Sequence, residues 1–350
     1  MTESSTVQAD AHRTLMQWLW GAMATQVVSV AVRLELADAI GNDGADIDDL
    51  AKTSDIPAQR LIRLLRALVG LGLCTEARPG RFTLTPAGSL LRKQNPGSLH
   101  DYARLVAEPI VQESWARLEF SMRTGRIAFE EAFGMPAFEY LANDPELSAL
   151  FNSAMSQGTR EAAAVLPEHY DFSQFTTVTD VGGGDGTLLT AILKRHPDLQ
   201  GVVFDTAEGA APAAETVRAA GLSGRCTVAT GDFCDAVPAG ADLYLLKSVL
   251  HNWDDDRAAT ILGNCRAAMP THGRLLIIDP VLPDTADSTI PAENPYLIDL
   301  DMLVLVGGKE RTRADFEQLC TRAGFTIADV TALPPQNGLS VIEAAPTRTR

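Results

Sequence analysis

The second half of the chain alternates short β-rich runs with helical stretches, and this alternation limits the fold more than any other feature. The runs are dominated by valine, isoleucine, leucine and threonine, and turn residues bound them. Five of them span residues 176–181, 201–205, 226–230, 241–247 and 273–279, and two more, 325–333 and 339–345, follow a helix predicted at 313–323. This pattern predicts an α/β domain with a mostly parallel, seven-stranded sheet covered by helices.

The first half is predicted to be mostly helical. Apolar residues recur at helical spacing over 15–40 and surround the helix, which is typical of burial in the chain's own core or against a partner chain. A helix at 48–54, a turn, a longer helix to about residue 71 and strands at 73–76 and 81–84 follow in the order of a winged helix. We therefore predict a disordered tail at 1–14, a winged-helix-like domain at 15–98, a helical connector at 99–166 and the α/β domain at 167–350.

Charge and cysteine content limit the kinds of partner that the chain is expected to bind. Acidic residues outnumber basic ones by 45 to 29, and a net charge of −16 disfavours nucleic acid and anionic membrane surfaces. The five cysteines show no CxxC pair and no zinc spacing, as expected of free thiols in a reducing compartment. Residues 1–14 do not resemble a signal peptide, and no apolar run has the length of a membrane span. We expect a soluble, cytoplasmic protein with a small-molecule partner and no metal.

A glycine-rich turn follows the first predicted strand. Gly182, Gly184 and Gly186 form a GxGxG pattern, whereas the dinucleotide fingerprint GxGxxG needs a glycine where this chain has Thr187. Glycine permits positive φ and lets a ligand approach the backbone closely. Asp180, just before the turn, would repel a pyrophosphate and attract an ammonium group. S-adenosylmethionine (SAM) carries an ammonium and a sulfonium, so the turn favours SAM over a dinucleotide.

Acidic residues also end the next two strands. Asp205 lies about 20 residues beyond the glycines, the spacing of a carboxylate that accepts from ribose hydroxyls. Asp232 and Phe233 follow the third strand, where an acid can accept from an adenine amino group and a ring can pack on the base. Carboxyl ends of parallel strands meet at the edge where open α/β sheets bind ligands. These residues therefore predict a nucleoside site.

One histidine lies at the same edge. His251 comes just after the fourth strand, with Trp253 beside it, whereas the other histidines lie in tail, helix-end or loop positions. Asp279 ends the fifth strand, and Glu310 lies in the segment GGKERT. Both carboxylates are predicted to reach the same cleft and to orient the imidazole.

Taken together, these motifs resemble the plant-type small-molecule O-methyltransferases, including the bacterial members that decorate aromatic natural products. The resemblance spans nearly the whole chain and rests on the winged-helix-like region, the FNxxM segment (Phe151, Asn152, Met155), DVGGGxG, GDF, the LK…HxW stretch and GGKERT. It implies a Rossmann-like SAM domain, an N-terminal domain that forms a homodimer, and S-adenosylhomocysteine as product.

The resemblance also implies roles for single residues. The SAM contacts it implies are Asp180, Gly182, Gly184, Asp205, Asp232, Phe233 and Lys247. His251 is similar to the family's general base and Glu310 to the carboxylate that positions it. The chain departs from the family at Asn252, often an aspartate, at Thr206–Ala207, often leucine–proline, and at Asp279, commonly a glutamate.

The reaction expected from these roles is in-line transfer of the SAM methyl group to a hydroxyl of a small aromatic acceptor. A phenol has a pKa near 10 and an imidazole one near 6.5, so His251 can take the proton during attack. The helical middle and the segment before GGKERT are expected to line the acceptor pocket, with candidates Met155, Trp115, Phe120, Phe151, Asn252, Met302 and Leu305.

Three other functions remain open at this point. A winged-helix DNA-binding regulator would use the arginines of residues 57–71, but the acidic total weighs against it. A relative with the same SAM fold could perform N-methylation or another SAM-assisted reaction. A nicotinamide-dependent oxidoreductase is disfavoured by Thr187 in place of the third fingerprint glycine.

Overall fold

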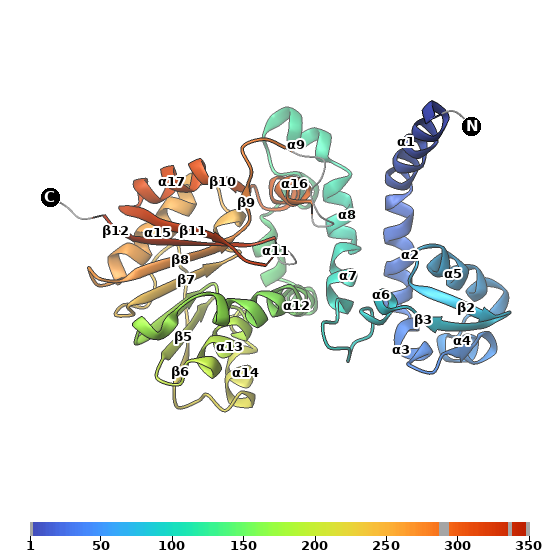
Figure 1. The fold of residues 1–350 in the computed structure, drawn as a ribbon, viewed down its shortest axis with the longest axis horizontal. Coiled ribbons are helices and arrows are strands. Elements are labelled where there is room, and N and C mark those ends of the chain that lie inside the picture. The colour runs from blue at the N-terminus through green and yellow to red at the C-terminus, as the bar shows by residue number, and fades with distance from the viewer. Residues whose placement is uncertain (1–2, 287–293, 335–337, 348–350) are drawn as a thin grey trace. The chain divides into compact units, whose positions relative to one another are not determined.

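The alternating segments of the second half form one seven-stranded sheet, as predicted (Figure 1). Its order is β11-β12-β8-β7-β4-β5-β6; β11 and β12 run antiparallel to their neighbours, and the other pairs are parallel. The strands are β4 (Thr177–Val181), β5 (Gln200–Asp205), β6 (Cys226–Thr230), β7 (Leu243–Lys247), β8 (Arg274–Asp279), β11 (Phe325–Ala332) and β12 (Ser340–Pro346). The computed structural model describes residues 3–286, 294–334 and 338–347.

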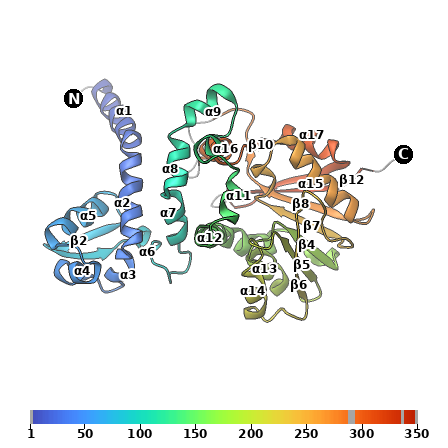
Figure 2. The same cartoon turned by 180° about the vertical axis from the view of Figure 1, so that it is seen from behind.

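Helices cover both faces of this sheet, because successive strand residues point to opposite faces. Helices α12, α13 and α14 lie on one face of the sheet and α15 and α17 on the other (Figures 1 and 2). Leu243 and Leu245 of β7 pack with the first group, and Tyr244 and Leu246 pack with the second. Since both faces are buried, the strands read as continuous apolar runs. The covering helices are α12 (Pro145–His169), α13 (Thr187–Arg195), α14 (Ala213–Ala219), α15 (Asp255–Ala268) and α17 (Arg313–Arg322).

Shorter elements complete this unit. They are α8 (Pro109–Trp115), α9 (Leu118–Thr124), α10 (Ala128–Phe133), α11 (Ala137–Ala142), α16 (Pro295–Leu305), the 3₁₀ helices η1 (Phe172–Gln174) and η2 (Leu250–Asn252), and the paired strands β9 (Val281–Leu282) and β10 (Arg311–Thr312). Side-chain caps fix two helix starts near the sheet edge: Asp254 accepts from two backbone amides of α15, and Thr312 forms a capping box with Asp315 at α17.

The N-terminal half contains the expected winged-helix order. Its core joins α2, α3, α4, α5 and the small sheet through Leu36, Leu61, Leu65 and Phe82. Its elements are α1 (Glu3–Leu19), α2 (Gly21–Arg33), α3 (Leu36–Ile40), β1 (Ala45–Asp46), α4 (Ile47–Ser54), α5 (Ala58–Gly70), β2 (Cys74–Arg78), β3 (Arg81–Leu84), α6 (Pro86–Ser89) and α7 (His100–Val106). The short strand β1, which pairs with β3, was not predicted.

The structure differs from two of the predicted boundaries. The expected tail at 1–14 is helical from Glu3, because 3–19 contains no proline or glycine and is rich in good helix formers. The connector at 99–166 is not a separate part: the chain divides into units Met1–Pro109 and Ile110–Arg350. The reason is packing, since α7 lies against α2 of the first unit and α12 lies against α13 of the second.

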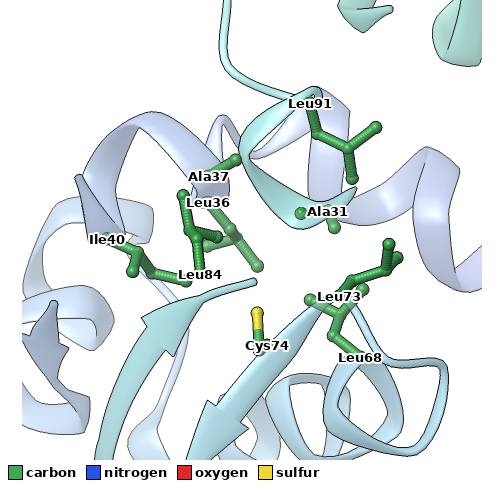
Figure 3. Close-up of a pocket in the computed structure, with 10 residues that line it drawn as sticks. Ala31, Leu36, Ala37, Ile40, Leu68, Leu73, Cys74, Leu84 and Leu91 are labelled. Atoms are coloured by element: carbon green, nitrogen blue, oxygen red, sulfur yellow. The ribbon is translucent and has the colours of Figure 1, made fainter. Parts of the chain in front are cut away.

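A small cavity lies inside the N-terminal unit (Figure 3). Its volume is about 10 Å³, close to the space of one water molecule, and its lining is apolar apart from the Cys74 thiol. Burial raises the pKa of Cys74 to about 11, so the thiol stays protonated. With no polar group to hold a ligand, the cavity is a packing gap.

No single helix in the described ranges is both long and apolar enough to span a membrane, although 10–19 of α1 and α2 together, bent by 51°, meet the length and composition limits.

Candidate active site

The strand order creates a crevice at one place along the sheet edge. β4 pairs with β5 on one side and with β7 on the other. The connection that follows β4 leads to β5 and the connection that follows β7 leads to β8, so the two connections run toward opposite ends of the sheet. Open α/β sheets bind ligands beyond the carboxyl ends of the strands at such a switch point. Asp180 of β4 and Lys247, the last residue of β7, lie at this edge.

The glycine-rich turn between β4 and α13 is held tightly. Gly182 has φ +73°, and a Cβ there would lie 2.5 Å from Val249 Cγ2. The Gly184 N–H donates to Asp205 Oδ2 at 2.8 Å, and the Thr206 N–H donates to Oδ1 at 2.7 Å. Burial raises the pKa of Asp205, and these two backbone hydrogen bonds oppose the rise. The Asp205 carboxylate therefore fastens the turn to the end of β5.

Asp180 is a buried acid without a partner. It is 1 % exposed, and neither carboxylate oxygen has a hydrogen-bond donor among the described residues. Burial raises its pKa to about 7, the charge of Asp205 adds to the rise, and the charge of Lys247 opposes it. Unsatisfied buried acceptors are costly, so this carboxylate is suited to a cationic donor. The ammonium group of SAM fits this requirement.

Helix α12 closes the same end of the site with groups that the sequence analysis missed. Lys247 Nζ donates to Thr159 Oγ1 at 3.2 Å, and Ser156 Oγ donates to Asp185 Oδ2 of the glycine turn at 2.5 Å. Burial lowers the pKa of Lys247, whereas the charges of Asp279 and Asp180 raise it. Thr159 lies four residues after Met155, one helical turn along the FNxxM face, and that spacing could have identified it.

A row of aromatic rings borders the predicted adenine region. Phe233 meets Trp253 edge-on with ring centroids 6.2 Å apart, Trp253 packs on Phe138 at 5.7 Å, and Phe138 meets Phe151 at 6.2 Å. Asp232 is exposed and accepts from the Cys234 N–H at 2.7 Å. The row joins two predicted residues, Phe151 and Phe233, through Phe138, which the sequence analysis did not single out.

His251 lies in η2, directly beyond β7, and is paired with Glu310. Its Nδ1 is 2.7 Å from Glu310 Oε1, and the side chains of His251 and Glu310 are 15 % and 0 % exposed. Burial lowers the pKa of His251, but the Glu310 hydrogen bond and the charges of Asp279 and Glu310 outweigh it and raise the pKa above the usual value. Glu310 thus fixes the imidazole orientation and leaves Nε2 without a hydrogen bond from any described residue.

Asp279 is fully buried at the end of β8, and neither of its oxygens has a hydrogen-bond partner in the described part of the chain. Burial raises its pKa to about 7, and the charge of His251 opposes the rise. The shorter aspartate therefore acts on His251 through charge, whereas the hydrogen bond comes from Glu310.

The segment GGKER fixes the backbone that carries His251. A Cβ at Gly308 would overlap the His251 carbonyl oxygen, and the Lys309 N–H donates to that same oxygen at 2.9 Å. The buried Arg311 guanidinium donates to the carbonyls of Leu250 and Trp253, at 2.8 and 2.9 Å, and to Asp255. Arg311 thus binds the backbone on both sides of the histidine. The sequence analysis did not predict this role for Arg311.

The other residues predicted to line the acceptor pocket have different surroundings, and the structure does not bring them all together. The Asn252 amide donates to the Ser248 carbonyl at 3.2 Å and so stabilises the local turn. Trp115 Nε1 donates to Asp301 of α16 at 2.6 Å, and Met302 is the next residue of that helix. Phe120 lies under Arg126, with the guanidinium 5.2 Å from the ring centroid. Met155 is exposed on α12, and Leu305 ends α16. Their contact with an acceptor stays a prediction.

No group of three or more histidine, cysteine, aspartate or glutamate side chains is arranged to hold a metal ion within the described ranges.

Comparison with known proteins identifies the family. The O-methyltransferase domain matches residues 115–326, and the O-methyltransferase dimerisation domain matches 16–94. An O-demethylpuromycin-O-methyltransferase from Streptomyces alboniger is 45% identical over 97% of this chain and 90% of that protein.

Solved structures agree with this assignment. The crystal structure of LaPhzM superposes with a TM-score of 0.90 at 40% identity, over 96% of this chain and 99% of that one. An O-methyltransferase from neocarzinostatin biosynthesis, solved with SAM and 2-hydroxy-5-methyl naphthoic acid, superposes with a TM-score of 0.78 at 34% identity, over 92% and 95%. The chain therefore belongs to the O-methyltransferase family and is a SAM-dependent enzyme with the family's dimerisation domain in its N-terminal half.

Proposed function

We propose that this enzyme transfers the SAM methyl group to a hydroxyl of a small aromatic acceptor, with His251 as general base. One observation carries the proposal: the 2.7 Å contact between His251 Nδ1 and Glu310 Oε1. A carboxylate on Nδ1 fixes the tautomer that leaves Nε2 able to accept a proton, and it stabilises the imidazolium that then forms. Both residues lie beyond the carboxyl ends of the strands that would hold SAM.

The chain's own groups supply binding, orientation and proton removal. SAM brings an electrophilic methyl group on a positive sulfur. Asp180, Asp205 and Lys247 would hold its amino-acid and ribose parts, and Phe233 would pack on its adenine. His251 Nε2 would take the acceptor proton as the oxygen attacks, which is typically worth about 10²–10⁴-fold in rate.

The relatives support an aromatic acceptor. The neocarzinostatin enzyme was solved with a hydroxylated naphthoic acid, and the relative at 45% identity is named for a demethylpuromycin substrate. Trp115, Phe138 and Phe151 of this chain are aromatic side chains that would offer such a ring apolar contacts.

The test combines ligand binding with methyl transfer. SAM is expected to raise the melting temperature and NAD to leave it unchanged, because only a ligand that binds the folded state stabilises it. Phenols with one free hydroxyl, incubated with SAM, should gain one methyl group on oxygen, and the matching anilines should not. Methylation of the anilines alone would replace this proposal with N-methylation.

We further propose that α1 and α2 bury their apolar side chains in a homodimer. Leu15, Trp18, Leu19, Trp20 and Met23 are 58–69% exposed on the single chain. An apolar surface of this kind marks an interface, and the dimerisation domain match covers all of these residues except Leu15. Trp18→Glu should convert a dimer to a monomer in light scattering; a wild-type monomer would contradict the proposal.

A further inference from the structure

One acid near His251 has no role in the functions proposed so far. Asp301 lies on α16, and Trp115 Nε1 donates to its Oδ1 at 2.6 Å. No Lys, Arg or other donor within the described ranges bonds to the second oxygen, Oδ2. Asp301 is thus a half-buried carboxylate that is oriented by a neutral indole and has no Lys or Arg partner in the described part of the chain.

Its position relative to the base is fixed. Asp299 of the same helix accepts from the Glu310 N–H at 2.8 Å, so α16 is fastened to the segment that carries the partner of His251. Burial raises the pKa of Asp301, and the Trp115 hydrogen bond and the charge of His251 oppose the rise. The helix that carries Asp301 is therefore tied to the base through Glu310.

The surroundings of the base hold more acceptors than donors. Glu310 Oε2 and both oxygens of Asp279 are buried without a partner in the described residues. Asp301 Oδ2 is a further acceptor with no donor there, and it is not fully buried. Buried carboxylate oxygens are costly unless a donor reaches them. A bound acceptor that carries its own donor would remove part of this cost, whereas a carboxylate at the same place would add repulsion.

We propose that Asp301 is a specificity-determining residue that accepts a hydrogen bond from an amino or second hydroxyl group next to the reacting hydroxyl. Since the proton of the reacting hydroxyl goes to His251, the group that meets Asp301 is a neighbour on the ring. The inference rests on the proposed function and adds the class of acceptor: o-aminophenols and catechol-like rings.

Three neutral rings of the same shape test this inference. They are 3-amino-2-naphthol, 2,3-dihydroxynaphthalene and 3-methyl-2-naphthol, which place an amine, a hydroxyl or a methyl beside the 2-hydroxyl. Their dissociation constants are measured by calorimetry on the full-length protein loaded with S-adenosylhomocysteine. We expect the amino and dihydroxy compounds to bind about ten- to a hundredfold more tightly than the methyl compound, the range for a hydrogen bond to a charged group.

Variants at Asp301 then assign the preference to this residue. Asp301→Leu removes the acceptor and should bring the three constants within about threefold of each other, with little change for the methyl compound. Asp301→Asn keeps an oxygen for the Trp115 N–H and should retain a reduced preference, since neutral hydrogen bonds are roughly half as strong as charged ones. Trp115→Phe should weaken the preference, because the carboxylate loses its orientation.

The outcomes separate the inference from the proposed function. Failure to bind S-adenosylhomocysteine would contradict the proposed function, and the inference would fall with it. If the protein binds S-adenosylhomocysteine but binds the three rings with equal affinity, or binds none of them, only the inference is overturned. An equal loss for all three rings in Asp301→Leu would also overturn it, since Asp301 would then hold the reacting hydroxyl rather than its neighbour.

Discussion

The SAM end and the base end of the site are built in different ways. At the SAM end, one continuous turn supplies Gly182 and Gly184, and a hydrogen bond from Gly184 to Asp205 closes it against the next strand. At the base end, the imidazole and its partner come from positions 59 residues apart and meet only because β10 and the GGKER segment lie against η2. Binding of SAM therefore depends on local backbone geometry, and proton removal depends on tertiary packing.

The largest effect that separates the two ends is expected at the base. His251→Ala should lower kcat by about 10²–10⁴-fold, because it removes the imidazole that would accept the proton. The dissociation constant of SAM should change by less than about threefold, since the glycine turn is untouched. Turnover is measured by S-adenosylhomocysteine release and binding by calorimetry. His272→Ala, in an exposed loop, is the matched control; wild-type turnover in His251→Ala would remove it as the base.

The second effect tests whether packing places the base. Gly308→Ala puts a Cβ into the His251 carbonyl oxygen and must displace η2. A displacement near 1 Å can cost about 10²-fold in rate, so kcat should fall by roughly that factor while SAM binding holds. The control is Gly263→Ala on α15, where a Cβ meets nothing within 4 Å. Unchanged kcat in Gly308→Ala would show that the GGKER segment does not position the histidine.

This contrast also explains what the sequence could predict. The seven strands and the winged-helix order follow from local periodicity, and both were predicted. GxGxG and Asp205 are close in sequence and could be interpreted together. Asp301 and Thr159 belong to no quoted motif, and only the packing of α16 and α12 gives them partners. Arg311 lies in GGKERT, but the motif alone does not show that it binds the carbonyls on either side of His251. The helix at 3–14 was missed because polar composition was taken as disorder, although it lacks any helix breaker.

The third effect lies at the SAM end. Asp205→Asn removes a charged acceptor of the Gly184 N–H and of the predicted ribose contact. Replacing a charged by a neutral hydrogen bond should weaken SAM about tenfold, while kcat at saturating SAM stays within about threefold. Calorimetry with SAM measures the first quantity, and initial rates at high SAM measure the second. A fall in kcat as large as that of His251→Ala would show that the two ends are not independent.

The smallest expected effect concerns how kcat/KM depends on pH at the base end. A base must be neutral to accept a proton, so kcat/KM should rise with pH and reach half its maximum at the pKa of His251. The Glu310 hydrogen bond and the charges of Asp279 and Glu310 raise that pKa despite burial, which places the midpoint above the usual 6.5. The rise therefore occurs at a higher pH than the titration of a free imidazole.

Glu310→Gln removes the charge of Glu310 and weakens its hydrogen bond, both of which raise the pKa of His251, and leaves burial, which lowers it. The midpoint should therefore move to lower pH. The plateau rate should also fall, because an amide stabilises the imidazolium less than a carboxylate does. Asp279→Asn is the informative comparison, since it removes a charge without breaking the Nδ1 hydrogen bond, and its midpoint should fall by less. A midpoint that moves upward in Glu310→Gln would mean that the titrating group is not His251, since loss of a carboxylate partner can only lower the pKa of an imidazole.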